Sequence, residues 1–239
     1  MGIRNNYFQI NDVSSLDFGI VISEGRTFGS PKRVYEEVSV PGRNGTVLFD
    51  EGYYENVTVS YTCSLINKEA EIDKFRAWLA HHVGYVKLED TYHPTEYRMA
   101  KVENGLDPTM SGWMLSRGDF QVTFSCKPQR YLKIGDYGTE YVSNLTLYNP
   151  TWYEAEPIIR IFGSGTLTVG DIQVNITTNP LNYIDLDSQT QDAYCGTDNA
   201  NQYVTLTNEK YPTLLVPSTN ITLGTGIEKI ILYPKWWTL

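Results

Sequence analysis

Residues 34–65 read V-Y-E-E-V-S-V-P-G-R-N-G-T-V-L-F-D-E-G-Y-Y-E-N-V-T-V-S-Y-T-C-S-L and carry the clearest structural signal in this chain. Asn44-Gly45 indicates a hairpin, because both residues tolerate the positive φ that a type I′ turn demands. The arm that follows alternates apolar and hydroxyl-bearing residues without a break from Val57 to Leu65. Since successive side chains of a strand point to opposite faces, we expect a hairpin tip near residue 44 and a half-buried strand after it.

The arm ahead of the turn alternates more weakly. One face would carry Val34, Glu36, Val38 and Val40, and the other Tyr35, Glu37 and Ser39. A glutamate among valines is unusual for a core strand. On these signals alone, the segment predicts a surface β-hairpin in an antiparallel sheet.

Size and composition favour a mainly β protein. The chain has 239 residues and a mass of 27.2 kDa, and 41% of its residues are hydrophobic. This is enough for two modest domains or one large β domain. Eighteen tyrosines and nineteen glycines favour strands and turns over a helix bundle.

The net charge of −9 is unevenly distributed. Residues 1–133 hold 15 basic and 17 acidic side chains, a balance of −2, whereas residues 134–239 hold 4 and 11, a balance of −7. A segment so acidic repels phosphate, so stable nucleic-acid binding is disfavoured. The acidity fits either an ordinary soluble surface or a surface past which DNA slides.

The chain has three cysteines, Cys63, Cys126 and Cys195, and three histidines, His81, His82 and His93. Neither set has the spacing of a zinc site, and the cysteines form no disulfide framework. We therefore predict core thiols and no metal site.

The N-terminus M-G-I-R-N-N-Y-F lacks the apolar region of a signal peptide, and no stretch approaches the roughly 18 apolar residues of a membrane span. Asn6 stands where N-myristoylation needs Ser or Thr. We expect a protein made and folded in the cytosol, without membrane insertion.

One helix is predicted over Asn67–Ala80. Its residues Ile72, Phe75 and Leu79 recur at helical spacing and would pack on the sheet, while Asn67 can cap its N-terminus.

Alternation at Tyr85–Glu89 and Gly118–Cys126 predicts two further strands of the same domain. Lys127-Pro128 would end this domain, and Ile134–Thr139 has the composition of a connection. We therefore expect two domains, residues 1–133 and 134–239.

The second half reads as a series of short strands separated by turn residues. The expected strands are Ile158–Phe162, Thr166–Val169, Ile172–Ile176, Tyr183–Leu186, Tyr203–Leu206, Ile221–Leu223 and Lys229–Tyr233. Seven short strands at this spacing are typical of a β-sandwich.

Asp185 and Asp187 would share one face of a strand about 7 Å apart, a distance compatible with a glycosidase carboxylate pair. Lectin-fold glycosidases of the laminarinase type place E-x-D-x-E on such a strand, whereas this segment reads D-L-D-S-Q and ends in Gln189. The acid and nucleophile roles cannot both be filled in that way, so a structural or solvated pair is the better interpretation. With Asp192, the two could instead share a calcium ion.

A saccharide platform is a third possibility for this region. It would be built from Asp185 and Asp187 with the aromatic side chains Trp152, Tyr194, Trp236 and Trp237. The chain has no phosphate loop, nucleophile elbow or signature Cys/His pair. We predict no enzyme, no catalytic residues and no cofactor.

Several segments resemble the distal tail protein (Dit) family of siphophages, which have long, non-contractile tails. S-E-G-R-T-F-G-S-P-K-R (23–33), V-P-G-R-N-G (40–45) and D-E-G-Y-Y-E-N (50–56) resemble its N-terminal domain. Later landmarks are Y-V-K-L-E-D-T-Y-H-P-T-E-Y-R-M-A (85–100), G-D-F-Q-V-T-F-S-C-K-P (118–128), Y-N-P-T-W-Y-E-A-E-P-I-I-R-I-F-G-S-G (148–165) and the ending I-L-Y-P-K-W-W-T-L. They follow one another through both halves of the chain.

The resemblance implies an N-terminal β-sandwich with one α-helix and an extended hairpin, followed by a galectin-like β-sandwich without an inserted module. It implies a virion protein of the tail tip, assembled in the bacterial cytoplasm, whose copies close into a ring, a hexamer in the family. The ring contacts would map to Pro41, Gly42, Arg43, Asn44 and Gly45. Its partners would be the tail-tube end or major tail protein, the tail-associated hub protein, and a receptor-binding protein or its adaptor.

Two other functions remain open from the residues. A saccharide-binding adhesin would use Trp236, Trp237, Asp185 and Asp187 against the host wall. A glycosidase would depend on Asp187.

Overall fold

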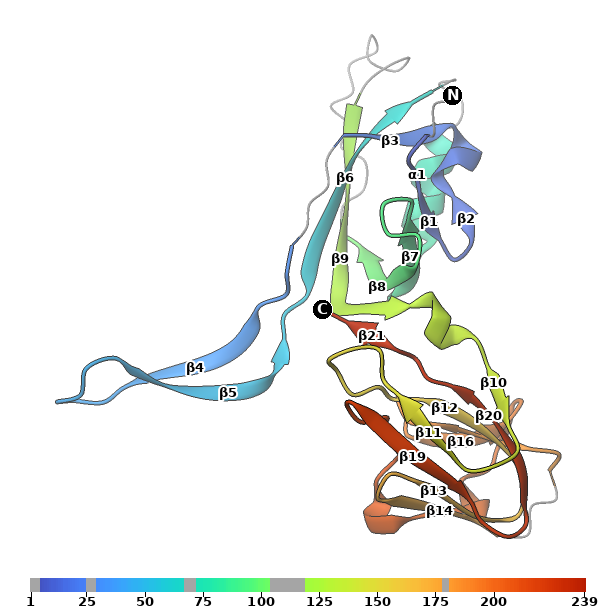
Figure 1. Ribbon diagram of the computed structural model, residues 1–239. Coiled ribbons are helices and arrows are strands. Elements are labelled where there is room, and N and C mark those ends of the chain that lie inside the picture. Colours follow the sequence, from blue (N-terminus) through green and yellow to red (C-terminus); the bar gives the residue numbers. More distant parts are fainter. Residues whose placement is uncertain (1–4, 25–28, 67–71, 104–118, 178–180) are drawn as a thin grey trace. The chain divides into compact units, whose positions relative to one another are not determined.

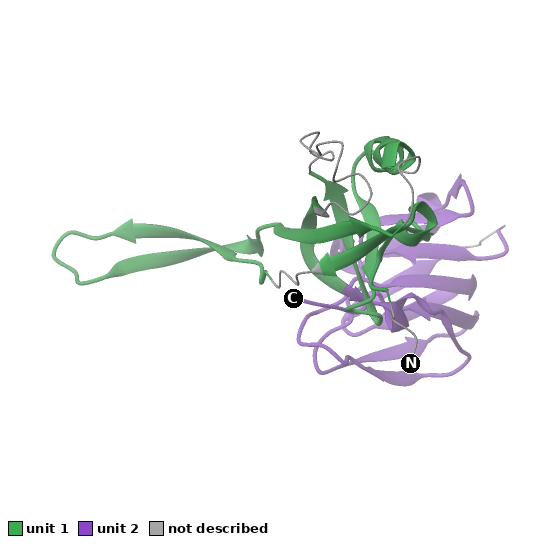
Figure 2. Ribbon diagram, turned by 90° about the horizontal axis from the view of Figure 1, so that it is seen from above, with its two compact units in different colours: residues 1–130, 239 green, residues 131–238 purple. Residues whose placement is uncertain are grey.

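The computed structural model describes residues 5–24, 29–66, 72–103, 119–177 and 181–239. The chain is mainly β with one α-helix, as predicted. It divides into two compact units: unit 1 is residues 1–130 with Leu239, and unit 2 is Tyr131–Thr238 (Figure 2).

Unit 1 is built on one strongly curled antiparallel sheet (Figure 1). Its strand order is β2-β1-β7-β8-β9-β6-β3. The bounds are β1 Phe8–Ile10, β2 Val13–Ser14, β3 Ile20–Glu24, β6 Val57–Leu65, β7 Val86–Asp90, β8 Glu96–Val102 and β9 Asp119–Leu132. The curl brings the edge strand β3 back to the start of the chain, where the Ile22 amide donates to the Asn6 carbonyl at 2.8 Å.

Strand β6 is the central strand that its alternation predicts. Its five odd-numbered residues, Val57, Val59, Tyr61, Cys63 and Leu65, are all buried in the core of unit 1. It pairs with β9 from Val57 opposite Cys126 to Ser64 opposite Asp119, and with β3 on its other side. One face of β6 therefore lies in the core, and its backbone forms hydrogen-bond ladders with β9 and β3.

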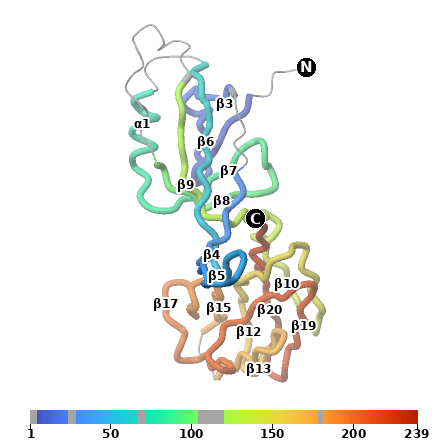
Figure 3. The backbone as a smooth tube through the Cα atoms, turned by 90° about the vertical axis from the view of Figure 1, so that its left-hand side faces the viewer, coloured from blue at the N-terminus to red at the C-terminus, as the bar shows by residue number. Residues whose placement is uncertain are grey.

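Helix α1 spans Ile72–His81, and the predicted start at Asn67 lies outside the described residues. Ile72, Phe75 and Leu79 are buried, which confirms the predicted apolar stripe. Figure 3 shows the helix beside the sheet that carries β6 and β9. Phe75 packs there against Phe8, with ring centroids 6.2 Å apart.

The central hairpin differs from the prediction in its second arm. β4 (Arg33–Ser39) pairs with β5 (Thr46–Tyr54) as a two-stranded sheet of its own, and Val57–Leu65 is not part of it. The regular alternation of β6 marks a strand in the main sheet. β5 was missed because neither of its faces is buried in this chain, so its pattern is irregular.

Unit 2 is a β-sandwich, as predicted. One sheet has the order β10-β20-β12-β15-β16-β17, with bounds Thr139–Tyr141, Ile227–Tyr233, Ile158–Gly163, Ile184–Asp187, Asp192–Cys195 and Asp198–Asn199. The other has the order β11-β19-β13-β14-β18, with bounds Leu145–Tyr148, Ser218–Leu223, Gly165–Val169, Ile172–Ile176 and Val204–Leu206. All seven expected strands are present.

The expected connection at residues 134–139 is ordered structure within unit 2. Lys133–Asp136 forms a 3₁₀ turn in which Gly135 is buried. A Cβ on Gly135 would lie 2.5 Å from the Trp236 amide nitrogen, so only glycine fits there. Strand β9 also continues through Lys127-Pro128 to Leu132, and the two units divide between Arg130 and Tyr131.

The last strand, β21 (Trp237–Thr238), pairs with β9, whose final residues Tyr131 and Leu132 belong to unit 2. The Leu132 amide donates to the Trp236 carbonyl at 2.8 Å. The end of the chain is thus tied to the beginning of the sandwich.

Candidate functional site

The β4–β5 hairpin presents apolar side chains to solvent. It extends beyond the curled sheet of unit 1, as Figures 1 and 2 show. Leu48, Phe49 and Tyr53 are each more than half exposed. An isolated two-stranded hairpin is marginally stable in water, and its outer edges offer unpaired backbone groups. The hairpin is therefore the element of unit 1 best suited to contact another surface.

The strand register defines two faces of the hairpin. Residues directly opposite in an antiparallel pair share a face. Val38 lies opposite Val47, and Glu36 lies opposite Phe49. These four residues form what we call the valine face, which confirms that Glu36 stands among apolar residues. The other face carries Tyr35, Glu37, Ser39, Thr46, Leu48 and Asp50.

The tip of the hairpin is a loop of residues 40–45, near the predicted position but with a different turn. The Arg43 amide donates to the Val40 carbonyl at 3.1 Å, and Gly42 has a φ of 80°. With Pro41 before it, this is the pattern of a type II turn. Asn44 is not in the left-handed region, so the predicted type I′ turn at Asn44-Gly45 is wrong. Proline fixes the φ that its position in a type II turn requires.

An ion pair clamps the base of the hairpin, where the register shifts between Arg33 and Tyr35. Arg33 Nε lies 2.8 Å and 2.9 Å from the two carboxylate oxygens of Asp50, and Arg33 Nη1 donates to the Tyr54 hydroxyl at 2.9 Å. The Gly52 amide also donates to Asp50 Oδ1, at 3.0 Å. The clamp therefore ties β4 to β5 at the base of the hairpin.

The clamp shifts the titration of both charged groups. The hydrogen bond to Arg33, together with that from the Gly52 amide, lowers the pKa of Asp50. The Asp50 hydrogen bond raises the pKa of Arg33. Sequence reasoning missed this pair, because its spacing has meaning only once β4 and β5 are in register.

Two of the aromatic residues expected to contact a saccharide, Trp236 and Trp237, pack within unit 2. Trp236 is 6% exposed and belongs to the core of the sandwich. Trp237 stacks on Tyr153 with ring centroids 4.5 Å apart, and its Nε1 donates to the Glu154 carbonyl at 2.8 Å. Burial corrects the expectation for Trp236, because its indole presents no face on which a sugar could stack.

The two aspartates expected beside them also have protein partners. Asp185 is buried and receives hydrogen bonds from Arg160 Nε at 2.7 Å and Nη2 at 2.9 Å. Asp187 is buried and accepts from the Gln189 and Thr190 amides at 2.9 and 3.2 Å. These contacts make Asp185 part of an ion pair and Asp187 a turn cap, and they favour the structural interpretation over the saccharide one.

The calcium hypothesis is not supported either. Asp192 Oδ1 lies 2.5 Å from Asn201 Nδ2, so the three aspartates hold three different partners. Among the described residues, no group of three or more His, Cys, Asp or Glu side chains could hold a metal ion.

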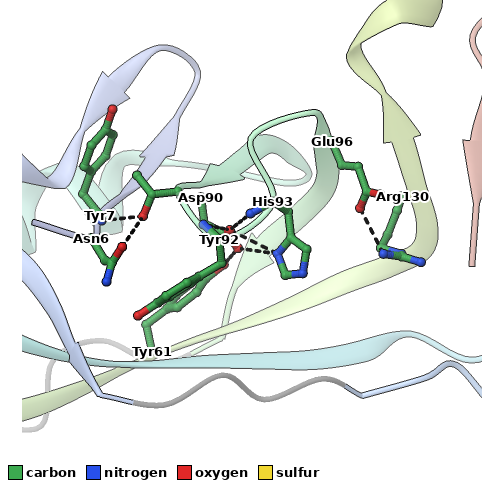
Figure 4. A network of polar contacts seen from close by, with 9 residues as sticks. Asn6, Tyr7, Tyr61, Asp90, Tyr92, His93, Glu96 and Arg130 are labelled. Carbon is green, nitrogen blue, oxygen red and sulfur yellow. Dashed lines mark hydrogen bonds and ion pairs between the residues drawn. The ribbon is translucent and has the colours of Figure 1, made fainter. Parts of the chain in front are cut away.

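A polar network in unit 1 superficially resembles a catalytic relay (Figure 4). The Tyr61 hydroxyl donates to Asp90 Oδ2 at 2.7 Å, and His93 Nδ1 lies 3.1 Å from Asp90 Oδ1. Burial, reinforced by the charge of Asp90, raises the pKa of Tyr61 well above its usual value, so the phenol stays protonated. The adjoining cavity, lined by Tyr61, Asp90, His93 and Arg98 among others, is about 20 Å³. That volume holds roughly one water and no substrate.

The same carboxylate shapes the turn between β7 and β8. Asp90 Oδ1 accepts from the backbone amides of Tyr92 and His93, each at 2.8 Å. The network therefore holds a β-turn in place, which accounts for His93 without a metal. No helix in the described part of the chain is long and apolar enough to cross a membrane.

Comparisons with known proteins find a match in the fold and none in the sequence. No protein-family model matches the chain, and no curated protein matches its sequence. The crystal structure of the Dit protein (gp 19.1) of phage SPP1 superposes with a TM-score of 0.67 at 11% identity, covering 98% of this chain and 99% of that one. A chain of the phage p2 baseplate in its activated conformation gives a TM-score of 0.49 at 11% identity, covering 97% and 98%.

The chain thus has the fold of SPP1 Dit along nearly its whole length. The resemblance seen in the sequence is confirmed for the fold: the chain is mainly β with one α-helix, has a hairpin inserted between β3 and β6, and ends in a β-sandwich.

Proposed function

We propose that this chain is a structural hub protein of a phage tail tip, of the distal tail protein kind. The observation that carries the proposal is the match to SPP1 Dit over 98% of this chain and 99% of that one. SPP1 Dit is described as a paradigm of the hub adsorption apparatus of phages that infect Gram-positive bacteria. A match over nearly the full length of both chains supports a shared role better than a match of one domain would.

The hairpin is the proposed ring contact, with Pro41, Gly42, Arg43, Asn44 and Gly45 at its tip. A hairpin that exposes Leu48 and Phe49 costs free energy in solution, and covering them against a neighbouring copy would recover it. Closure of identical copies into a ring makes one interface serve every subunit. The Arg33–Asp50 clamp supports this role, because it holds the two strands of the hairpin together at their base.

The mechanism is geometric and breaks no bond. A closed ring offers one face to the tail-tube end, another to the tail-associated hub protein, and its periphery to receptor-binding proteins or their adaptor. The protein would reside at the tail tip of the virion after assembly in the bacterial cytoplasm. The side chains of Tyr61, Asp185 and Asp187 are hydrogen-bonded to other groups of the protein, which supports a non-enzymatic role.

The test compares wild type with a hairpin-shortened variant. Tyr35 and Asp50 lie opposite each other, so replacing residues 36–49 with Asn-Gly joins them by a two-residue turn and keeps the Arg33–Asp50 clamp. Light scattering and negative-stain imaging are made with the tail-hub protein of the same phage present. We expect a wild-type ring of about 163 kDa, from six chains of 27.2 kDa, and no ring from the variant.

Circular dichroism and thermal unfolding of the variant serve as the control for folding. If the two proteins form identical rings, the hairpin is not the contact. If wild type forms no ring at any concentration, with or without the hub protein, the proposed hub function itself is wrong.

A further inference from the structure

One aromatic side chain of unit 2 is almost fully exposed although the backbone around it is fixed. Trp152 is 88% exposed, and its side chain makes no hydrogen bond or ring contact within the described structure. It lies in the loop N-P-T-W-Y-E (149–154), which connects β11 in one sheet to β12 in the other (Figure 1).

The loop is held from its first residue. The Asn149 amide donates to the Pro217 carbonyl at 2.9 Å, and Asn149 Nδ2 donates to the Tyr153 carbonyl at 2.9 Å. Asn149 Oδ1 accepts from the Thr151 amide at 2.8 Å. A single half-buried amide side chain thus bridges both sides of Trp152.

The loop is also held after Trp152. Tyr153 stacks on Trp237, whose Nε1 donates to the Glu154 carbonyl. Ala155 is fully buried and pairs with Leu214 through hydrogen bonds of 3.1 and 2.8 Å. The Trp152 backbone is therefore fixed on both sides, and only its indole faces solvent.

A fixed, exposed tryptophan is suited to recognition. Tryptophan is enriched among residues that dominate binding energy, and a preordered backbone lowers the entropy lost on association. Tyr148, the last residue of β11, is 75% exposed and lies four positions before it.

Charge indicates the chemistry of the partner. Between residues 134 and 239 there are 4 cationic and 11 acidic side chains. Three of the cations are already paired, in Arg160–Asp185, Lys229–Glu140 and Lys235–Asp136, and the other eight acidic side chains of this segment form no ion pair with any residue that the structure describes. Glu154, two residues after Trp152, is one of these and is exposed.

We propose that Trp152 anchors a docking site for an arginine-bearing segment of a partner protein. The guanidinium lies over the face of the indole, which is the best aromatic acceptor for a cation, and Glu154 pairs with its charge. The inference rests on the proposed hub function only in expecting unit 2 to dock another tail protein. It specifies where that docking occurs and which chemistry it uses.

The probe is a fluorescein-labelled peptide of alternating glycine and arginine, titrated into the full-length protein and followed by anisotropy. The same peptide with citrulline replacing arginine keeps the size and planar shape of the side chain, but its neutral urea has lost the charge and carries a carbonyl acceptor in place of one NH2 donor. We expect the arginine peptide to bind, the citrulline peptide to bind at least about tenfold more weakly, and rising ionic strength to weaken binding.

The variants are Trp152→Ala, Trp152→Phe and Glu154→Gln, with Tyr137→Ala as the matched control. Tyr137 is also an aromatic of unit 2 and is 70% exposed. We expect Trp152→Ala to raise the Kd at least about tenfold, the Phe and Gln variants to raise it less, and Tyr137→Ala to leave it within about twofold.

Equal binding by wild type and Trp152→Ala would overturn the proposal. So would binding of an N-acetylglucosamine tetrasaccharide that depends on Trp152 while the arginine peptide does not bind, since this would make the loop a sugar site. Ring assembly by Trp152→Ala is measured in parallel. A variant that assembles normally but has lost the peptide separates this site from the hairpin contact, whereas failure of the wild-type ring concerns the hub proposal alone.

Discussion

Cys126 shows how burial controls the chemistry of a single side chain. It is fully buried in unit 1, and this burial raises the pKa of its thiol to about 12. Since the thiolate is the reactive form, only about one thiol in ten thousand would be ionised at pH 8. Cys63 is buried as well, whereas Cys195 is partly exposed.

We therefore predict that an aromatic disulfide reagent at pH 8 modifies Cys195 in the native protein and reaches Cys63 and Cys126 only on unfolding. Absorbance of the released thiol measures the number of reacting groups. In Cys195→Ser the native protein should release almost none. Rapid release from this variant at a model-thiol rate would contradict the buried state of the other two.

Asp50 is the residue through which pH acts on the hairpin. Its folded-state pKa lies below the ordinary value of 3.8, so its contribution to stability is fully present above 3.8 and is lost as the pH falls through the lower folded-state value. We predict that NMR contacts across the base of the hairpin, between Arg33 and Tyr54, weaken in this acidic range. The effect on global stability should be small, because the pair is exposed to solvent.

Asp50→Asn is the control, because the amide does not titrate and should abolish the acid transition. A carboxyl group that titrates at or above 3.8 in wild type would show that the clamp does not persist in solution.

At the scale of elements, β6 is the strand whose two faces are most different. Val59 is buried between Val57 and Tyr61, whereas Thr58 is exposed. An unpaired carboxylate placed in the core loses its hydration without gaining a partner.

We predict that Val59→Asp lowers the free energy of unfolding by about 3 kcal/mol or more, and that Thr58→Asp changes it by less than about 1 kcal/mol. Urea unfolding followed by circular dichroism measures both. Similar midpoints for the two variants would mean that the faces of the strand are assigned the wrong way round.

At the scale of the whole molecule, the proposed role of the hairpin is to join neighbouring copies of the chain in a ring. Each interface of a closed ring can be weak, because the last contact is intramolecular and benefits from a high effective concentration. A monomer in dilute solution is therefore compatible with a ring in the tail.

We predict that Arg43→Glu raises the concentration at which rings appear, since the charge at the hairpin tip is reversed at every interface. Lys74→Glu makes the same change of charge at an exposed position of α1 and should leave the threshold concentration for ring formation unchanged. Light scattering across a dilution series measures the threshold. Identical thresholds for all three proteins would make Arg43 an ordinary solvated charge.

Local pattern was sufficient for much of the fold. The alternation of Val57–Leu65, the helical spacing of Ile72, Phe75 and Leu79, and the seven short strands of the second half all appear in the structure. Each is an element with one buried side, and burial of one side imposes a period that can be read along the chain.

Packing between distant segments settled what the pattern could not. Trp236 and Trp152 are equally apolar in the sequence, yet Trp236 lies in the core of unit 2 and Trp152 is 88% exposed. Trp236 directly precedes β21, which pairs with β9, whereas Trp152 lies in a loop between strands. Arg33 and Asp50 form a clamp only because β5 pairs with β4, which the sequence did not show. Alternation along the sequence shows which residues share one face of a strand. Burial and ion pairing depend instead on which strand, distant in the sequence, packs beside that face.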